Sequence, residues 1–202
     1  MSLLFETIKV FNRKLLNIPY HNERMNRSRR KLFSCSNDLD LAGLVEIPID
    51  ITNDIYKCKV IYSDDIQEIE WTRYTPRKIE HLKLAYCNEI DYSYKYLERS
   101  IFEKLLRENG CNENEDILII KNGRVTDTSY SNIALFDGKE WSTPKHPLLK
   151  GTQRAKLIDE KKIIEQDIWL EELKHYQEII LINAMLEFDQ REAKLVNEFI
   201  KT

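Results

Sequence analysis

The first third of the chain shows the alternating hydrophobic pattern of half-buried strands, interrupted by one helical segment. Apolar residues recur at every second position of 56–62, which places them on one face of an extended strand. In 22–33, Met25, Ser28 and Leu32 share one side at helical spacing, and basic residues occupy another. The pattern predicts a helix over 22–33 and strands over 5–11, 47–51, 56–62 and 66–74.

The rest of the chain is punctuated by turn residues. Asn122-Gly123 and Asp137-Gly138 each separate two apolar runs, and both dipeptides favour the positive φ angles of tight hairpins. The segment 97–109 has a helical apolar face and is followed by Gly110, a typical residue after a helix end. We therefore predict two hairpins, a helix over 97–109, strands over 81–87 and 178–182, and a closing helix over 190–200.

A change of pattern after Pro76 predicts a domain boundary. Strands with one helix precede it, and a mixture of helices, hairpins and strands follows. We expect two α/β domains, a small one over 1–77 and a larger one over 78–202.

Composition narrows the class of protein. The 202 residues are 42% hydrophobic and 32% charged, with a net charge of −3, which is typical of a soluble globular protein. No stretch approaches the roughly 18 apolar residues of a membrane span, and residues 1–10 lack the order of a signal peptide. The four cysteines are widely spaced, which favours reduced thiols over a metal site or disulfides. We expect a cytoplasmic protein with no membrane partner and no metal.

Basic residues gather at 24–31. They could form a solvated helix face or a nucleic-acid patch. The cluster is short, lacks interleaved aromatic residues and belongs to an acidic chain, so we expect no nucleic-acid partner.

Two segments offer candidate chemistry. Lys95 lies among tyrosines at the entry to a helix; a partly desolvated lysine gives up its proton more easily and can attack a carbonyl group. The alternative is a lysine that extends past the rings to water. Gly151, before an apparent helix, could offer backbone N–H groups to an anion or could simply allow a turn.

Six short segments in chain order resemble the motifs of one enzyme family. They are 5–8 (FETI), 21–25 (HNERM), 95–99 (KYLER), 125–133 (VTDTSYSNI), 143–154 (TPKHPLLKGTQR) and 182–185 (INAM). Together they resemble the class IV aminotransferase family, the fold type IV pyridoxal-phosphate (PLP) enzymes, and most closely its 4-amino-4-deoxychorismate lyase branch. The resemblance implies a two-domain, mixed α/β (α+β), D-amino-acid-aminotransferase-like fold, shortened at the N-terminus.

The resemblance also implies roles for individual residues. Lys95 would carry PLP covalently and move protons at the substrate carbon. Asp127, where the family usually has Glu, would contact the pyridine nitrogen. Phosphate contacts would come from Arg24, from the N–H groups of Thr152 and Gln153, and from Asn183. We expect the cofactor to lie between the two domains, because ligands favour domain interfaces. The resemblance implies a homodimer whose partner helps cover the substrate side.

The reaction is left open between related chemistries. Thr7 stands where the lyases tend to have Thr, so the resemblance gives it a catalytic place and favours a lyase that acts on a small-molecule amine in folate biosynthesis. The alternatives are an aminotransferase for branched-chain or D-amino acids and a non-catalytic relative that keeps the fold.

Overall fold

A computed structural model describes residues 2–201 and divides the chain into two compact units. Unit 1 comprises Met1–Pro76 and Tyr94–Glu98, and unit 2 comprises Arg77–Ser93 and Arg99–Thr202. The first division follows Pro76, but the short segment around Lys95 groups with unit 1 and not with the larger unit, where the sequence pattern places it.

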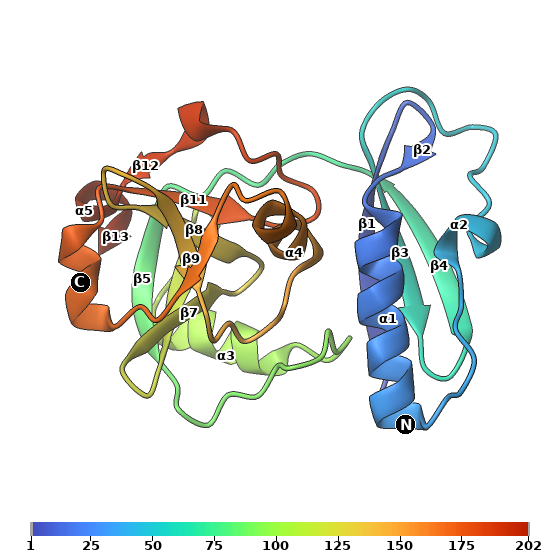
Figure 1. The fold of residues 1–202 in the computed structure, drawn as a ribbon, viewed down its shortest axis with the longest axis horizontal. Coiled ribbons are helices and arrows are strands. Elements are labelled where there is room, and N and C mark those ends of the chain that lie inside the picture. The colour runs from blue at the N-terminus through green and yellow to red at the C-terminus, as the bar shows by residue number, and fades with distance from the viewer. Residues whose placement is uncertain (1, 202) are drawn as a thin grey trace. The chain divides into compact units, whose positions relative to one another are not determined.

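Unit 1 is a four-stranded antiparallel sheet covered on one face by a helix (Figure 1). The strands are β1 (Leu4–Phe11), β2 (Lys14–Leu15), β3 (Tyr56–Tyr62) and β4 (Ile66–Arg73), in the order β2-β1-β3-β4. The helices are α1 (Ile18–Phe33) and the short α2 (Leu41–Leu44). Helix α1 begins four residues before the predicted start at residue 22, because Pro19 in its first turn needs no N–H partner there.

Alternation along β1 and β3 explains the core of unit 1. Every second residue is fully buried and faces α1, and these residues pack with Met25 and Leu41: Leu4, Ile8, Val10, Cys58, Val60 and Tyr62. The intervening residues therefore point to the opposite face of the sheet. The predicted strands over 5–11, 56–62 and 66–74 are confirmed within one or two residues.

The predicted strand over 47–51 is wrong. Arg13 donates from Nη1 to the carbonyl groups of Pro48, at 3.0 Å, and Ile51, at 2.5 Å. Pro48 has no N–H for a ladder, and the side chain of Ile49 is 96% exposed. A side-chain guanidinium thus takes the backbone acceptors that a neighbouring strand would need.

Unit 2 contains two sheets. One has the order β13-β5-β6-β7 and the other β10-β9-β8-β11-β12. The first comprises β5 (His81–Tyr86), β6 (Glu115–Lys121), β7 (Arg124–Thr128) and β13 (Ile200–Lys201). The second comprises β8 (Asn132–Phe136), β9 (Trp141–Pro144), β10 (Ile164–Gln166), β11 (Glu178–Ile182) and β12 (Lys194–Leu195). The helices are α3 (Ser100–Glu108), α4 (Thr152–Asp159), α5 (Val196–Phe199) and the 3₁₀ turns η1 (Leu170–His175) and η2 (Gln190–Glu192).

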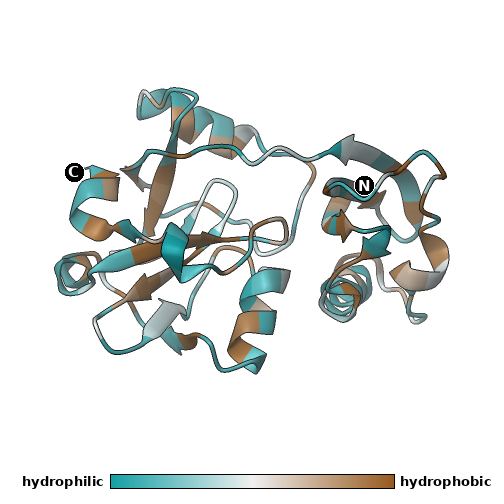
Figure 2. Cartoon of the chain, turned by 90° about the horizontal axis from the view of Figure 1, so that it is seen from above, coloured by the Kyte–Doolittle hydropathy of each residue, from teal (hydrophilic) through white to brown (hydrophobic). Residues whose placement is uncertain are grey.

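The main core of unit 2 joins residues from both sheets. Leu118 and Val125 of the first sheet pack with Ile133 and Ile179 of the second. A second cluster joins Ala134 and Ile180 to Leu157 of α4, so this helix packs against the second sheet. Figure 2 shows hydrophobic and hydrophilic segments alternating along the strands of each unit.

Both predicted hairpins are confirmed. Strand β6 pairs with β7 and β8 pairs with β9, and Asn122, Gly123 and Gly138 all have positive φ. Helix α3 ends before Gly110, which also has a positive φ of 59°. The predicted helix over 190–200 is wrong, because Lys194 and Leu195 pair with β11 and Ile200 pairs with β5, which leaves a 3₁₀ turn over Gln190–Glu192 and four α-helical residues, Val196–Phe199.

All four cysteines are free thiols. No helix within residues 2–201 combines the length and the apolar character needed to cross a membrane.

Candidate functional site

Lys95 lies at the edge of β1 in unit 1. Phe5 N–H donates to the Lys95 carbonyl at 3.0 Å, and Leu97 N–H donates to the Leu3 carbonyl at 2.9 Å. These bonds extend β1 and fix the backbone on both sides of Lys95. Its Nζ lies 4.5 Å from the centre of the Phe5 ring, so the ammonium contacts the aromatic face of Phe5.

Thr7 shares a face of β1 with Phe5. Residues 5 and 7 alternate with the buried, α1-facing positions, so both side chains point away from α1. The Lys95 ammonium lies over the Phe5 ring on that same face. Unit 1 therefore brings the two predicted catalytic residues, Lys95 and Thr7, to one region.

Arg24 is held by a buried carboxylate. Its Nε donates to Glu6 Oε1 at 2.8 Å and its Nη2 donates to Glu6 Oε2, which gives a two-point contact. His21 Nδ1 lies 2.6 Å from the same Oε2 atom. The arginine that the resemblance assigns to a phosphate is thus oriented by two residues that sequence analysis did not single out.

The charges of this triad follow from burial and pairing. Burial alone would raise the pKa of Glu6, but the charge of Arg24 and the hydrogen bonds from His21 and Arg24 outweigh it and lower the pKa to about 2. Burial lowers the pKa of His21 despite the nearby carboxylate. At neutral pH the triad is therefore a carboxylate, a guanidinium and a neutral imidazole. A charged residue on the otherwise apolar, α1-facing side of β1 is the signal that could have revealed Glu6.

Asp127 of β7 is the buried carboxylate of unit 2. Asn132 Nδ2 donates to its Oδ1 at 2.8 Å, and Leu149 N–H donates to its Oδ2 at 2.9 Å. Burial raises the pKa of Asp127 to about 6, although these hydrogen bonds oppose the shift. The carboxylate is thus anchored to the turn that leads into α4.

Gly151 begins that helix, and its lack of a side chain is required by Asn132. A β-carbon at this position would lie 2.0 Å from Asn132 Oδ1. The first intrahelical bond runs from Ala155 N–H to the Gly151 carbonyl, so the N–H groups of Thr152 and Gln153 point to the N-terminal end of α4. Thr152 and Gln153 are both buried. Unit 2 therefore brings Asp127 and this helix N-terminus together through Asn132.

Asn183 closes a turn after β11. Its Oδ1 accepts from Met185 N–H at 2.9 Å, and its Nδ2 donates to Ser131 Oγ at 2.9 Å. The side chain thus connects this turn to the loop between β7 and β8. Its predicted contact with a phosphate stays a prediction.

Arg99 stabilises the same β7–β8 loop from the segment that follows Lys95. Its Nη2 donates to the Ser129 carbonyl at 2.5 Å and its Nη1 donates to Tyr92 Oη at 3.1 Å. The guanidinium also lies 4.6 Å from the ring centre of Phe102 and 4.7 Å from that of Tyr130. The arginine of the KYLER segment is therefore a positioning residue for the loop after Asp127.

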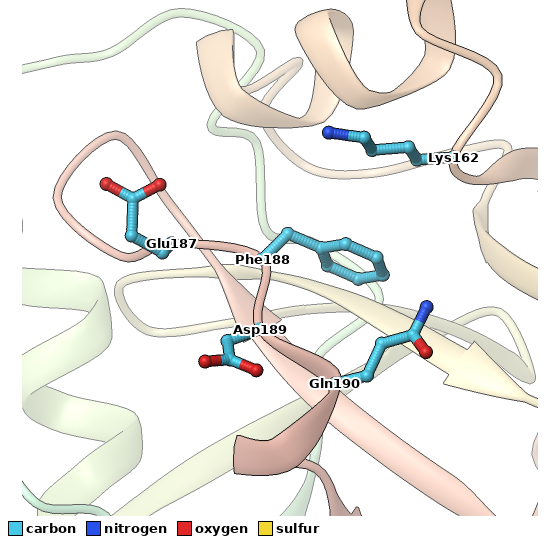
Figure 3. Close-up of a pocket in the computed structure, with 5 residues that line it drawn as sticks. All are labelled: Lys162, Glu187, Phe188, Asp189 and Gln190. Atoms are coloured by element: carbon cyan, nitrogen blue, oxygen red, sulfur yellow. The ribbon is translucent and has the colours of Figure 1, made fainter.

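A separate surface pocket of unit 2 contains none of these residues (Figure 3). It is lined by Lys162 and by 187–190, with the Phe188 ring between them. Phe188 also packs edge-on against Trp141 at 5.5 Å. The pocket therefore lies at the edge of the second core cluster, which contains Trp141 and against which Phe188 packs.

Comparison with known proteins gives the class of this chain. The family model for class IV aminotransferases matches residues 92–188. An uncharacterised Haemophilus influenzae protein is 38% identical over 188 residues, which cover 92% of this chain and 98% of the relative. The chain belongs to the class IV aminotransferase family, as the motifs predict.

Two solved structures place the fold more closely. The crystal structure of a proposed 4-amino-4-deoxychorismate lyase from Haemophilus somnus is 35% identical, with a TM-score of 0.81, and the match covers 92% of this chain and 97% of that one. The PLP-bound form of a hypothetical aminotransferase from Mycobacterium tuberculosis is 18% identical, with a TM-score of 0.72, over 91% of this chain and 78% of that one. The predicted mixed α/β fold of type IV is confirmed.

The residues of each unit fit the chemistry of PLP. Asp127 offers a buried carboxylate for a pyridine nitrogen. The close approach of Gly151 to Asn132 keeps the backbone N–H groups at the start of α4 beside this carboxylate. In unit 1, an amine and a fixed guanidinium supply the two other groups that such a cofactor requires.

Proposed function

We propose that this chain is a PLP-dependent enzyme and that its reaction is the conversion of 4-amino-4-deoxychorismate to p-aminobenzoate and pyruvate. The observation that carries the cofactor proposal is the connection of the buried Asp127 carboxylate to the Gly151 turn. The likeness to the Haemophilus somnus protein supports the lyase over other reactions of the family. When bound, PLP supplies an electron sink for the carbon that bears the substrate amine.

Each site residue has a separate role in the proposed reaction. Lys95 would hold the cofactor through Nζ, and its amine then removes the proton from the amine-bearing carbon and gives it to the departing enolpyruvyl group. Asp127 accepts a hydrogen bond from the pyridine nitrogen and stabilises its positive charge. Arg24, already oriented by Glu6, binds the phosphate together with the N–H groups of Thr152 and Gln153.

The overall reaction needs no oxidant. The ring loses the proton at the amine-bearing carbon, and the neighbouring carbon–oxygen bond to the enolpyruvyl group breaks. The released enol becomes pyruvate, and aromatisation of the ring drives the elimination. Thr7, on the same face of β1 as the Phe5 ring beneath Lys95, provides a hydroxyl group for the leaving oxygen.

The test uses the purified chain supplied with PLP. We expect visible absorbance from lysine-bound cofactor, its loss in Lys95→Ala, and release of p-aminobenzoate from 4-amino-4-deoxychorismate. Keto-acid formation from amino acids, without p-aminobenzoate, would instead assign an aminotransferase. Cofactor binding without turnover of any amine would assign a non-catalytic relative. A colourless protein that takes up no PLP would contradict the proposal.

A further inference from the structure

Arg154 of α4 is a buried cation that the proposed reaction does not use. Its Nη2 donates to the Pro144 carbonyl at 2.9 Å and to Glu165 Oε1 at 2.6 Å. The arginine is 3% exposed, whereas the side chain of Glu165 is 43% exposed. Its Nε is buried and has no hydrogen-bond partner in the part of the chain that the structure describes. The positive charge is therefore only partly compensated, since a buried charge normally has a buried partner and a full set of hydrogen bonds.

The bond to Pro144 closes the loop between β9 and α4. Pro144 is the last residue of β9 and Arg154 lies in the first turn of α4, so the guanidinium joins the two ends of the loop 145–150. Asp127 holds the same loop from within, because its Oδ2 accepts from Leu149 N–H at 2.9 Å. Two buried side chains of opposite charge therefore fix one loop.

Arg154 and Asp127 are also connected through Gly151. A β-carbon on Gly151 would lie 2.0 Å from Asn132 Oδ1 and 3.9 Å from the Arg154 β-carbon. Asn132 in turn donates to Asp127 Oδ1 at 2.8 Å. The cation and the carboxylate thus belong to one buried cluster, where little water screens their attraction.

Other charged side chains of the elements around Asp127 are held elsewhere. Three basic residues lie within 4.0 Å of a carboxylate oxygen of Asp167: Arg124, Lys145 and His146. Lys121 of β6 donates to a backbone carbonyl at 2.6 Å, and Lys150 is exposed. Asp116, the buried carboxylate of β6, lies beside the hydroxyl groups that follow Asp127. Arg154 is therefore the buried cation whose charge acts on Asp127.

The pKa of Asp127 responds to this arrangement. Burial raises the pKa to about 6, and the hydrogen bonds from Leu149 and Asn132 and the charge of Arg154 oppose that shift. Without the guanidinium, a larger share of the protein would carry a protonated Asp127 at neutral pH.

We propose that Arg154 is a positioning residue for the cofactor site of unit 2, which closes the loop 145–150 around Asp127 and keeps that carboxylate ionised. The inference rests on the proposed function, in which Asp127 accepts a hydrogen bond from the pyridine nitrogen. Only the ionised carboxylate can stabilise a positive charge on that nitrogen.

The pKa of Asp127 in the apoprotein tests this role. Carboxyl ¹³C NMR follows the titration, and Asp127→Asn identifies the signal by its loss. We expect the pKa to rise by about 1 in Arg154→Met, because a nearby opposite charge lowers a carboxyl pKa by about 1–3. Arg154→Lys keeps the charge and the wild-type pKa. Lys156→Met is the control, since it removes a cation of the same helix that lies against Glu160.

The sign of the change separates this role from a merely structural one. If Arg154 only stabilised the fold, its loss would admit water to Asp127, and the pKa would fall toward 3.8. A lowered or unchanged pKa in Arg154→Met therefore overturns the inference. If that variant does not fold, Arg154→Gln, which keeps a donor for the Pro144 carbonyl, replaces it with the same expected rise and the same contrary outcomes.

PLP titration at two pH values separates the inference from the proposed function. We expect the Kd of Arg154→Met relative to wild type to be about fivefold larger at pH 6 than at pH 8, because a pKa of about 7 in place of about 6 reduces the ionised fraction of Asp127 mainly at the lower pH. A raised pKa in a protein that takes up no PLP would contradict the proposed function and leave the action of Arg154 on Asp127 standing. PLP binding with the same Kd ratio at both pH values would overturn the role of Arg154 alone.

Discussion

A β-carbon on residue 151 would lie 2.0 Å from Asn132 Oδ1, so Gly151 and Asn132 fix each other's identity. Asn132 donates from Nδ2 both to Asp127 and to the Leu149 carbonyl, each at 2.8 Å. A single amide side chain therefore connects the buried carboxylate with the start of α4. The glycine is required here by close approach, since its φ of −70° suits any residue.

Gly151→Ala tests this connection. We expect the unfolding free energy to fall by about 1–3 kcal/mol, because Asn132 must move away from a rigid backbone. We also expect PLP affinity to fall, since the turn that carries the N–H groups of α4 moves with it. Urea unfolding and PLP titration measure the two effects. Gly43→Ala is the control, because a β-carbon there meets nothing within 4 Å and Ala favours the helix. Equal behaviour of the two variants would contradict the argument.

Glu6→Gln tests the buried triad. The substitution keeps the shape but removes the charge that compensates Arg24, whose side chain is only 7% exposed. Leaving a buried guanidinium without its ion-pair partner costs about 3–5 kcal/mol. Urea unfolding at pH 7 measures the loss, and Glu70→Gln, on the side of the sheet away from α1, is the control. A loss no larger than that of the control would show that the triad does not hold Arg24.

The same triad predicts acid sensitivity. The pKa of Glu6 is lowered from 4.5 to about 2 by its partners, which outweigh burial. Its contribution to stability is complete above pH 4.5 and is lost as pH falls toward 2, by roughly 3 kcal/mol in all. Urea unfolding of wild type across this range measures the loss. A flat profile between pH 4.5 and 2 would be inconsistent with the ionised carboxylate.

The local elements of the fold were predictable from the sequence, and the buried polar contacts were not. Hairpins at Asn122-Gly123 and Asp137-Gly138 follow from the conformational freedom of two adjacent residues. Residues 47–51 have the composition of a strand, but Arg13, more than thirty residues away, takes their carbonyl groups. No local pattern encodes such a contact.

In the candidate site, too, the sequence predicts residues within local motifs but not contacts between distant segments. Motif order identified Lys95, Asp127 and Gly151, because each lies in a short segment with its own signature. Glu6 and Asn132 act by holding another residue in place, so their roles appear only when distant segments are brought together. The unit to which Lys95 belongs likewise depends on its backbone pairing with Leu3 and Phe5.

Asp127 predicts a pH dependence of the unfolding free energy that is opposite in sign to that of Glu6. Burial raises its pKa from 3.8 to about 6, so the folded protein without cofactor holds this proton more tightly than the unfolded chain does. Between pH 3.8 and 6 this group lowers the unfolding free energy as pH rises, by roughly 3 kcal/mol in all. Asp127→Asn removes that component, and the exposed Asp159→Asn does not. Urea unfolding of the apoprotein across this range measures it, and parallel profiles for wild type and Asp127→Asn would refute the assignment.

Arg99→Lys tests the contact between the segment after Lys95 and the β7–β8 loop. The single nitrogen of lysine cannot reproduce contacts made from two separate guanidinium nitrogens to Ser129 and Tyr92, nor the contact of a planar guanidinium with the Phe102 and Tyr130 rings, so we expect a loss of about 1–3 kcal/mol. Tyr130 is 60% exposed, and chymotrypsin cleavage at this residue reports on the loop itself. Cleavage accelerates in Arg99→Lys but not in Arg107→Lys, which changes an exposed arginine of α3. If both variants are cleaved at the wild-type rate, the loop is held by its own turn contacts, and Arg99 has no positioning role.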